Sequence, residues 1–565
     1  MSKSQDGLAS VAPESALCDW IRRKTGDSLL AQAAAVAARA ERAGHACAWL
    51  PDEGFDQSQL DRLRDSSWVS PCVTGAPFVL DEDGRFYVRR NAAAEEAVAN
   101  SLLARAKSQS LPVDGIAPML EELLPDDASC EQRAALAAGV GRSLFVLTGG
   151  PGTGKTTSLL ALLLVTLRLR LLAGSPDSAR IALAAPTGKA AARMVQALRE
   201  RLGRLHTTLG SDWQPALQVA AGLEATTLHR LLGHRVAGDA MLLAADVVAV
   251  DEASMVDLGL MRTLLQSLRP GSLLILLGDP DQLASVEAGS VLADIIAAAP
   301  GTLLASCVRR LAHSHRAQAA FTGLLNAVRS GDARAVRGAA EGHAAPLRIK
   351  AVPDARALHG VLQAWLRRHE DVYSGLLKPG LHPRDALAML RRVQVLCALR
   401  HGTFGQIALN EAIEDWLRRQ HQVRPVTWFP GRVVMITQND RESGLSNGDI
   451  GVVLDNGSGP MAWFEDATDE AGTPRAIATH LLPPSEAAWA ITIHKAQGSE
   501  YESIAALLPP ASDSPILSRE LVYTALSRAR HDADLWCTDA ALDAALARPV
   551  RRAGGLRDRL LRRAQ

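Results

Sequence analysis

Residues 147–157, LTGGPGTGKTT, decide the fold of this 565-residue chain. They follow an apolar run at 143–147 and precede a second apolar run at 159–167, which is the strand, loop and helix order of a phosphate-binding loop. The glycines let successive N–H groups point at a triphosphate, and the helix adds its positive N-terminal end. We therefore expect nucleotide binding by Gly149, Gly150, Pro151, Gly152, Thr153, Gly154, Lys155, Thr156 and Thr157.

The chemistry of nucleotide hydrolysis assigns roles within and beyond this loop. We expect Lys155 to contact the β- and γ-phosphates and Thr156 to ligate Mg²⁺. A glycine-rich turn with a chance lysine is the alternative, and an acidic strand end downstream argues against it. The stretch VVAVDE at 247–252 provides that strand end, with Asp251 for the Mg²⁺ shell and Glu252 as the base for the attacking water. Gln282 follows another apolar strand and is suited to sensing the γ-phosphate, although a plain turn is the competing interpretation.

Composition limits the remaining possibilities. The chain is too long for one core, and its 47% hydrophobic content is typical of globular domains. The formal net charge of zero does not indicate nucleic acid, although a local groove can be basic in a neutral protein. Seven scattered cysteines without a C-x-x-C pair predict neither a metal site nor a disulfide framework. With no signal peptide and no apolar run of membrane-spanning length, we expect a soluble cytoplasmic protein.

Hydrophobic patterning predicts several units along the chain. Short apolar strands predict a parallel sheet covered on both faces, at 143–147, 181–185, 247–250 and 273–277. Further strands predict a second α/β block, at 393–399, 504–508 and 534–537. Between them, residues 426–482 are rich in valine and turn residues, and they predict a small β-barrel. Before the first sheet, residues 1 to about 115 look like a separate unit with a helix at 29–43 and a hairpin at 77–89, while the arginine-rich tail after Arg548 predicts a solvated helix.

Nine segments resemble, in order, the motifs of superfamily 1 helicases, and within them those of the RecD family, the alpha chains of exodeoxyribonuclease V. The first seven resemble motifs I, Ia, Ib, II, III and IV and a segment particular to RecD: GGPGTGKTT (149–157), APTGKAAARM (185–194), TTLHRLLG (226–233), VDEASM (250–255), GDPDQLASVEAGSVLAD (278–294), LAHSHR (311–316) and CALRHGTFGQIALN (397–410). The last two resemble motifs V and VI: AITIHKAQGSEY (490–501) and ELVYTALSRAR (520–530). One such match is weak evidence, whereas nine in order are specific.

The resemblance implies roles for further residues. Gln132 is similar to the glutamine that reads adenine, and Gly498 of motif V joins the nucleotide-binding set. Arg316 and Arg528 resemble the two arginines that reach the γ-phosphate from the second motor domain, with a plain surface arginine as the alternative for each. Contacts with the DNA backbone are implied for Pro186, Thr187, Gly188, Lys189, His229, Thr492, His494 and Lys495, whose short polar and cationic groups suit phosphate binding along a single strand.

The resemblance also implies an architecture: an α/β protein with two RecA-like P-loop NTPase domains. The implied units are a mostly helical partner-docking domain at 1–115, a RecA-like domain with the ATP site at 116–300, a second RecA-like domain at 301–425 and 483–550, an SH3-like β-barrel insertion at 426–482 and a tail at 551–565. The implied activity is ATP- and Mg²⁺-dependent 5′ to 3′ translocation on single-stranded DNA from duplex ends, with RecB-like and RecC-like subunits. No nuclease acid cluster is visible in the sequence.

Two other functions are compatible with the sequence. One is a stand-alone 5′ to 3′ helicase of the same superfamily, although the N-terminal block shows no tandem helix-hairpin-helix glycine pattern. The other is a non-motor role, in which ATP binding only switches an assembly. The complete set of coupling residues favours a motor, and stimulation of ATP hydrolysis by single-stranded DNA would distinguish the motor from the switch.

Overall fold

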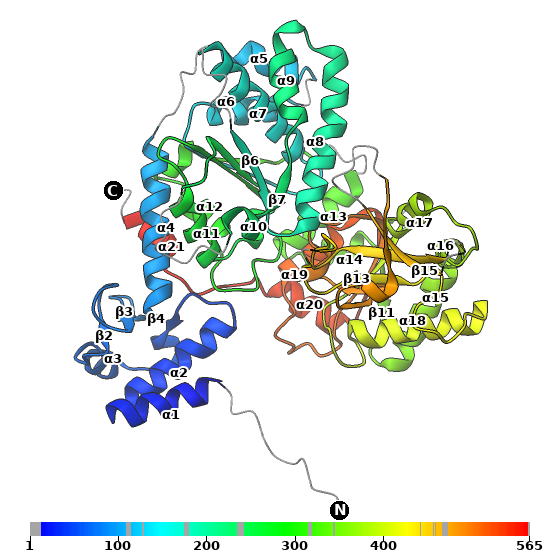
Figure 1. The fold of residues 1–565 in the computed structure, drawn as a ribbon. Coiled ribbons are helices and arrows are strands. Elements are labelled where there is room, and N and C mark those ends of the chain that lie inside the picture. The colour runs from blue at the N-terminus through cyan, green and yellow to red at the C-terminus, as the bar shows by residue number, and fades with distance from the viewer. Residues whose placement is uncertain are drawn as a thin grey trace, which may run out of the picture.

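The computed structural model of the chain describes residues 13–108, 115–126, 129–173, 180–233, 242–314, 319–342, 345–440, 442–455, 457, 459–465 and 473–562. The strands in these ranges form four sheets. Figure 1 shows the N-terminal elements below the first large α/β unit, with the second α/β unit beside it. Within the described ranges, no helix is both long enough and apolar enough to cross a membrane.

The first large sheet has the strand order β10-β5-β9-β8-β6-β7, and all neighbouring strands are parallel. Alternate residues of β5 enter two different cores: Leu144 and Val146 lie in one, and Phe145 and Leu147 lie in the other. The predicted parallel sheet, covered on both faces, is therefore confirmed. Its strands are β5 (Leu144–Gly149), β6 (Ile181–Ala185), β7 (Ala225–Thr227), β8 (Val247–Val250), β9 (Leu273–Gly278) and β10 (Val308–Leu311).

Helices cover both faces of this sheet. One core contains residues of α5 (Ile116–Leu123), α6 (Cys130–Gly139), α7 (Lys155–Leu172), α8 (Gly188–Thr208) and α9 (Gln214–Ala221). The other contains residues of α4 (Arg89–Lys107), α10 (Leu228–Leu232), α11 (Leu258–Ser267), α12 (Val291–Ala298) and α21 (Leu556–Arg562).

The second large sheet is also parallel, in the order β11-β20-β19-β12-β18. Three of its strands confirm the predicted second α/β block, although β19 and β20 begin earlier than expected because their first residues are partly polar. The strands are β11 (Leu347–Ala351), β12 (Val393–Cys397), β18 (Ala490–Thr492), β19 (Tyr501–Leu507) and β20 (Ala529–Cys537). The helices of this unit are α13 (Ala319–Ser330), α14 (Ala333–Gly338), α15 (Ala355–Arg368), α16 (Glu370–Leu376), α17 (Pro383–Leu390), α18 (Gln406–His421), α19 (Arg519–Leu526) and α20 (Asp539–Ala547).

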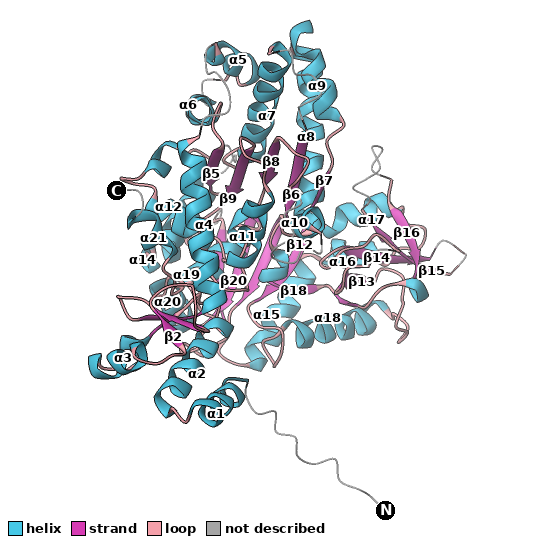
Figure 2. Cartoon of the chain, turned by 60° about the vertical axis from the view of Figure 1, so that its left-hand side comes forward, coloured by secondary structure: helices cyan, strands magenta, loops and turns pink. Residues whose placement is uncertain are grey.

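An antiparallel sheet is inserted between β12 and β18 in the chain. Its order is β16-β15-β14-β13-β17, and Figure 2 shows β13 to β16 at one side of the molecule, beside α16 and α17. The predicted β-rich insertion is thus present, but its fifth strand lies beyond residue 482. The strands are β13 (Val433–Ile436), β14 (Ile450–Asp455), β15 (Pro460–Phe464), β16 (Arg475–Ala478) and β17 (Ser485–Ala487).

The N-terminal block contains the predicted helix and hairpin. The hairpin pairs β3 with β4 in antiparallel register and turns at Gly84, whose φ of +85° favours glycine. The block also carries a four-stranded sheet in the order β1-β4-β3-β2. Its elements are α1 (Pro13–Thr25), α2 (Ser28–Arg42), α3 (Gln57–Arg64), β1 (Ala48–Trp49), β2 (Val69–Ser70), β3 (Phe78–Leu80) and β4 (Arg85–Val88).

Two expectations about the chain ends are wrong. Residues 1–115 are not a separate unit, because α4 packs into the core of the first large sheet and Arg105 donates to the carbonyl of Ser272 at 2.7 Å. The tail after Arg548 is not a solvated helix, because Leu556 and Leu560 of α21 are 1% and 0% exposed in the same core. The sequence pattern of each helix is weakly apolar, so the pairing of the two helices could not be read from either one.

Candidate functional site

The loop after β5 has the geometry of a phosphate cradle. Gly152 and Gly154 have φ of +75° and +80°, a region that only glycine enters without strain, and α7 begins directly afterwards. A Cβ at Gly149 would lie 2.9 Å from the carbonyl oxygen of Leu311, so the loop lies against β10 without room for a side chain. Lys155 donates from Nζ to the carbonyls of Gly149 at 2.7 Å and Gly150 at 3.1 Å, which places its ammonium at the mouth of the loop.

The acidic strand end lies opposite this lysine. Asp251 follows β8 and accepts a hydrogen bond from the backbone N–H of Glu252 at 2.8 Å. Burial and the Glu252 carboxylate raise the pKa of Asp251, while Lys155 lowers it. A carboxylate next to a second acid and a lysine fits the coordination of Mg²⁺ between protein and phosphate, whereas the described residues contain no group of three acids, histidines or cysteines that could hold a metal alone. Thr156, the other predicted ligand, lies in the first turn of α7.

Gln282 keeps one hydrogen-bonding atom available at the site. Its side chain is 6% exposed, and its Nε2 donates to Oδ2 of Asp279 at 3.3 Å. Its buried Oε1 has no hydrogen-bond partner among the described residues. Because a buried polar atom is normally bonded, this oxygen fits a residue that accepts a hydrogen bond from a water at the γ-phosphate.

The second α/β unit contributes a residue that the sequence interpretation missed. Tyr523 of α19 donates from its hydroxyl to Oδ2 of Asp279 at 3.0 Å, and both side chains are buried. The same hydroxyl would lie 3.1 Å from a Cβ at Gly150 of the phosphate-binding loop. Tyr523 lies inside the segment that resembles motif VI, but the sequence did not indicate that its hydroxyl contacts Asp279.

A further contact joins the phosphate-binding loop to the connection between the two units. Glu131 accepts the N–H groups of Ala312 and His313 at 2.7 and 2.9 Å, and the Ser314 hydroxyl donates to the carbonyl of Pro151 at 3.3 Å. The start of the segment resembling motif IV is therefore positioned at the loop. Glu131 is beside the predicted Gln132, but nothing in the sequence singled it out.

Gln132 and Arg528, two residues predicted at the nucleotide site, are bonded to protein groups in this arrangement. Gln132 is 3% exposed and donates to the carbonyl of Thr153 at 3.1 Å, so its amide stabilises the phosphate-binding loop. Arg528 is 3% exposed and donates to Thr524, Ser499 and Ser527, all within its own unit. Arg316 lies outside the described residues.

The predicted DNA-binding residues of the first unit lie at one edge of its sheet. Pro186 to Lys189 follow β6, and the segment with His229 follows β7, which pairs in parallel with β6. The Thr187 hydroxyl accepts the N–H of Ala190 at 3.2 Å and begins α8, while His229 is exposed on α10. The ammonium of Lys189 lies 5.9 Å from the ring centroid of Tyr501 in the second unit.

The predicted DNA-binding residues of motif V lie at the end of β18, where Thr492 is the last residue of the strand, and just after it. Thr492 accepts the N–H of Lys495 at 3.3 Å, and Lys495 donates from Nζ to Oε1 of Glu486 at 2.7 Å. Glu486 also accepts from Arg400 at 3.1 Å, so the cationic groups of Lys495 and Arg400 both lie beside its carboxylate. Burial and Arg552 lower the pKa of His494, which favours the neutral form of its ring.

Motifs Ia and V meet across the interface between the two units. Gly498 has φ of +75°, and a Cβ there would lie 3.2 Å from Cβ of Ala190 in α8. Arg193 of α8 donates to the carbonyl of Gly498 at 3.2 Å and forms an ion pair with Glu500. The predicted Gly498 therefore lies in the interface between the two units, against α8.

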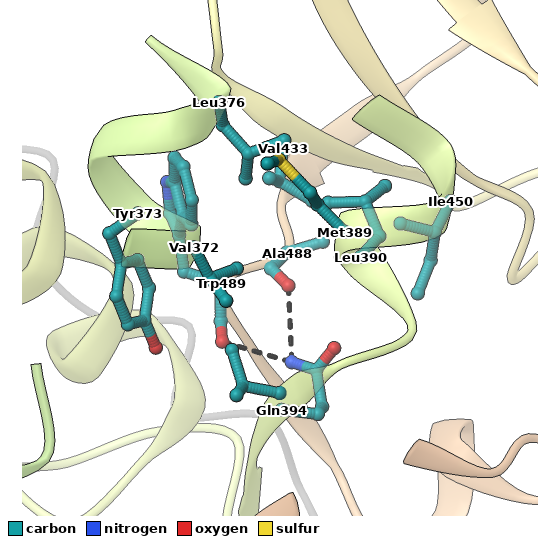
Figure 3. Close-up of a pocket in the computed structure, with 11 residues that line it drawn as sticks. Val372, Tyr373, Leu376, Met389, Leu390, Gln394, Val433, Ile450, Ala488 and Trp489 are labelled. Carbon is teal, nitrogen blue, oxygen red and sulfur yellow. Dashed lines mark hydrogen bonds between the residues drawn. The ribbon is translucent and has the colours of Figure 1, made fainter. Parts of the chain in front are cut away.

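A separate cavity lies between α16, α17 and the inserted sheet. Figure 3 shows the Gln394 amide directed at the carbonyls of Ala488 and Trp489, to which it donates at 3.2 and 2.9 Å. The cavity has a volume of about 20 Å³ and mostly apolar walls, so it has room for roughly one water molecule and none for a nucleotide. It belongs to the packing of the insertion on the second unit.

Comparisons with known proteins agree with this arrangement. The AAA domain family matches residues 127–345, and the UvrD-like helicase C-terminal domain family matches residues 487–535. The chain is 38% identical over 558 residues to the RecBCD enzyme subunit RecD of Mycobacterium tuberculosis (strain ATCC 25618 / H37Rv), covering 94% of this chain and 92% of that protein. The chain belongs to the RecD family. This RecD protein is accordingly an ATP-dependent DNA helicase.

Two other similarities are more partial. The ATP-dependent RecD2 DNA helicase of Deinococcus radiodurans is 32% identical over 465 residues, covering 79% of this RecD chain but 54% of RecD2. The crystal structure of Bacteroides Pif1 bound to single-stranded DNA is 16% identical, covers 73% of this chain and 92% of Pif1, and has a TM-score of 0.39.

Proposed function

We propose that this RecD chain is the 5′ to 3′ motor of a RecBCD-type helicase–nuclease, and that it hydrolyses ATP between its two α/β units. The observation that carries the proposal is the meeting of three elements at one place: the phosphate-binding loop, the acidic end of β8 and Tyr523 from the second unit. Because both units form the site, binding and hydrolysis of ATP can change the position of one unit relative to the other. A motor requires this coupling.

The residues of the site have separate roles in this proposal. Lys155 and the loop N–H groups bind the β- and γ-phosphates, and Glu252 accepts the proton of the attacking water. Gln282 orients that water through its free amide oxygen. Mg²⁺, held by Thr156 and Asp251, supplies neutralisation of phosphate charge when bound. Arg528 and Arg316 complete the site from the second unit only when the interface closes, because Arg528 is occupied within its own unit here.

Single-stranded DNA runs across the edge where motifs Ia and V meet. Lys189 and Lys495 bind its phosphates, with Thr187, Thr492 and His494 as further polar contacts and Pro186 and His229 flanking the path. Both lysines lie near the inter-unit contact of Gly498 with Ala190, so relative movement of the units changes the spacing of their phosphate contacts. That change of spacing converts hydrolysis into movement along the strand.

The assembly is the second part of the proposal. RecB-like and RecC-like subunits bind the N-terminal block and deliver duplex ends, and nucleolytic cleavage belongs to a partner. The inserted sheet forms an SH3-like barrel, and the whole acts in the cytoplasm, where the seven free cysteines remain reduced. The stand-alone alternative is less well supported, since the chain is 38% identical to the Mycobacterium RecD subunit over 558 residues but 32% identical to the Deinococcus RecD2 helicase over 465.

The test of the site compares two variants with the parent protein. Lys155→Ala should abolish ATP hydrolysis, because the phosphates lose their main cation in a partly desolvated site. Glu252→Gln should still bind a fluorescent ATP analogue but should not turn over. Retained DNA-stimulated hydrolysis in either variant would contradict the proposed ATP site.

A further inference from the structure

The chain crosses back from the second unit to the first at its C-terminal end. After α20, residues 548–555 leave the second unit, and α21 packs on α4 and α12 of the first (Figure 1). We call residues 548–562 the C-terminal strap. Because the two units are already joined by the chain near β10, the strap is a second covalent connection between them.

The strap is fixed at two places along its length, at Ala553 and at Arg559. The N–H of Ala553 donates to Nδ1 of His45 at 2.8 Å, and its carbonyl accepts from Ala46 at 2.8 Å. Further along, Arg559 forms an ion pair at 3.2 Å with Glu95, whose side chain is 1% exposed. The strap is therefore held by the N-terminal block and α4 through backbone, ionic and apolar contacts.

Arg552 lies at the centre of the strap and contacts only neutral acceptors. Its guanidinium donates to the carbonyls of Gly44 at 3.0 Å and Gly289 at 3.4 Å, and more closely to those of Ser285 and Glu287. Among the described residues no carboxylate forms an ion pair with it, and burial lowers its pKa. A cation removed from water without a counter-ion is costly, so its place here needs a reason other than charge pairing.

The loop that Arg552 holds begins at the ATP site. It starts at Asp279 and Gln282, and Leu283 then donates to Thr524 at 2.8 Å and accepts from Gln497 at 3.0 Å, both in the second unit. The loop ends at Gly289, whose N–H donates to the carbonyl of Gly44 at 2.9 Å. One short loop thus contacts the ATP site, the second unit, the N-terminal block and the strap.

We propose that Arg552 is a positioning residue for ATP turnover. It fixes the loop from Ser285 to Gly289, so that Gln282 stays at the ATP site and Leu283 stays between Thr524 and Gln497. Movement of the second unit at Leu283 is then transmitted to Gln282, because the other end of the loop, at Ser285 to Gly289, is held in place. This inference rests on the proposed ATP site and names a residue outside it.

The experiment uses two independent perturbations, each with a matched control. Arg552→Ala removes the guanidinium, and the exposed neighbour Arg551→Ala is its control. Gly44→Ala pushes on the guanidinium from the other side, because its Cβ would lie 2.5 Å from Nη1 of Arg552. Gly54→Ala is the control for backbone strain, since Gly54 has nearly the same φ (+86° against +85°) and nothing within 4 Å of the added Cβ.

We expect Arg552→Ala and Gly44→Ala to lower the ratio of DNA-stimulated to basal ATP hydrolysis by about 10- to 100-fold, as a misplaced catalytic group does. Arg552→Lys should restore part of the ratio, because an ammonium still donates to two or three of the carbonyls. A purely structural role would lower the melting temperature and leave the ratio unchanged at temperatures well below melting. The inference is overturned if both variants keep the ratio within twofold of their controls while Lys155→Ala is inactive, whereas an active Lys155→Ala would overturn the ATP site itself.

Discussion

Replacing Tyr523 with phenylalanine tests how the second unit completes the ATP site. The substitution removes one oxygen and keeps the ring, so the packing of α19 is preserved. It deletes the hydrogen bond to Asp279, which is 3.0 Å long and joins the two units within a buried environment. Asp279 then still accepts from the backbone N–H of Asp281 at 3.1 Å and from Gln282 at 3.3 Å, but among the described residues it has no donor from the second unit.

The magnitude follows from the kind of bond that is lost. Hydrogen bonds to charged groups contribute about 1.5–3 kcal/mol, or about 10- to 150-fold in an equilibrium. Burial raises the pKa of Asp279, which lowers the benefit of a donor when the acid is protonated, so we expect the lower part of that range. If closure of the units precedes each turnover, kcat/KM for ATP should fall about 10- to 30-fold.

The assay is steady-state ATP hydrolysis at saturating single-stranded DNA, with the melting temperature measured in parallel. Tyr501→Phe is the matched control, because Tyr501 is also buried but its hydroxyl has no hydrogen-bond partner among the described residues. Equal kcat/KM in the two variants would refute the claim that the Tyr523 bond contributes to closure. A loss confined to Tyr523→Phe would support it.

Three further predictions use different measurements. Arg528→Ala should lower DNA-stimulated turnover about 10³-fold or more if it stabilises the transition state, and a loss of only a few-fold in stopped-flow phosphate release would show that its bonds within the second unit are its whole role. Lys189→Ala and Lys495→Ala should each reduce the slope of log affinity against log salt by about 0.7 on single-stranded DNA, measured by fluorescence anisotropy; unchanged slopes would remove both residues from the DNA path. Burial and the Glu95 charge raise the pKa of Asp294 to about 7, so the folded protein binds this proton more tightly than the unfolded chain and stability should fall as the pH rises from about 4 to 7. Asp294→Asn should flatten that fall in a series of melting temperatures, and an unchanged pH dependence would contradict the assignment.

The sequence predicted most reliably what is encoded within a few neighbouring residues. The strands β5, β6, β8 and β9 appear at the predicted positions because buried parallel strands are short, unbroken apolar runs. The loop at 149–157 appears as predicted because glycine, lysine and threonine each have a local reason to be there. The positions of Asp251 and Gln282 follow from the same logic, since Asp251 comes directly after β8 and Gln282 four residues after β9.

Contacts between distant segments could not be predicted in this way. Tyr523 and Asp279 are 244 residues apart, and Arg559 and Glu95 are 464 apart, so no local pattern connects them. The same reason explains why the sequence pattern wrongly predicts a separate unit for the segment with α4 and a solvated helix for the C-terminal strap. Arg528 illustrates a different limit. Its side chain is bonded within the second unit, and its predicted role requires a movement of that unit relative to the first.

The central claim is that ATP hydrolysis at this site moves the chain along single-stranded DNA from the 5′ end. The most direct measurement is strand separation of matched duplexes with a 5′ or a 3′ tail, by this chain assembled with RecB-like and RecC-like subunits whose own motor is inactivated. We predict ATP-dependent unwinding of the 5′-tailed duplex by the parent chain and none by Glu252→Gln. Unwinding of only the 3′-tailed duplex, or equal unwinding by Glu252→Gln, would contradict the claim.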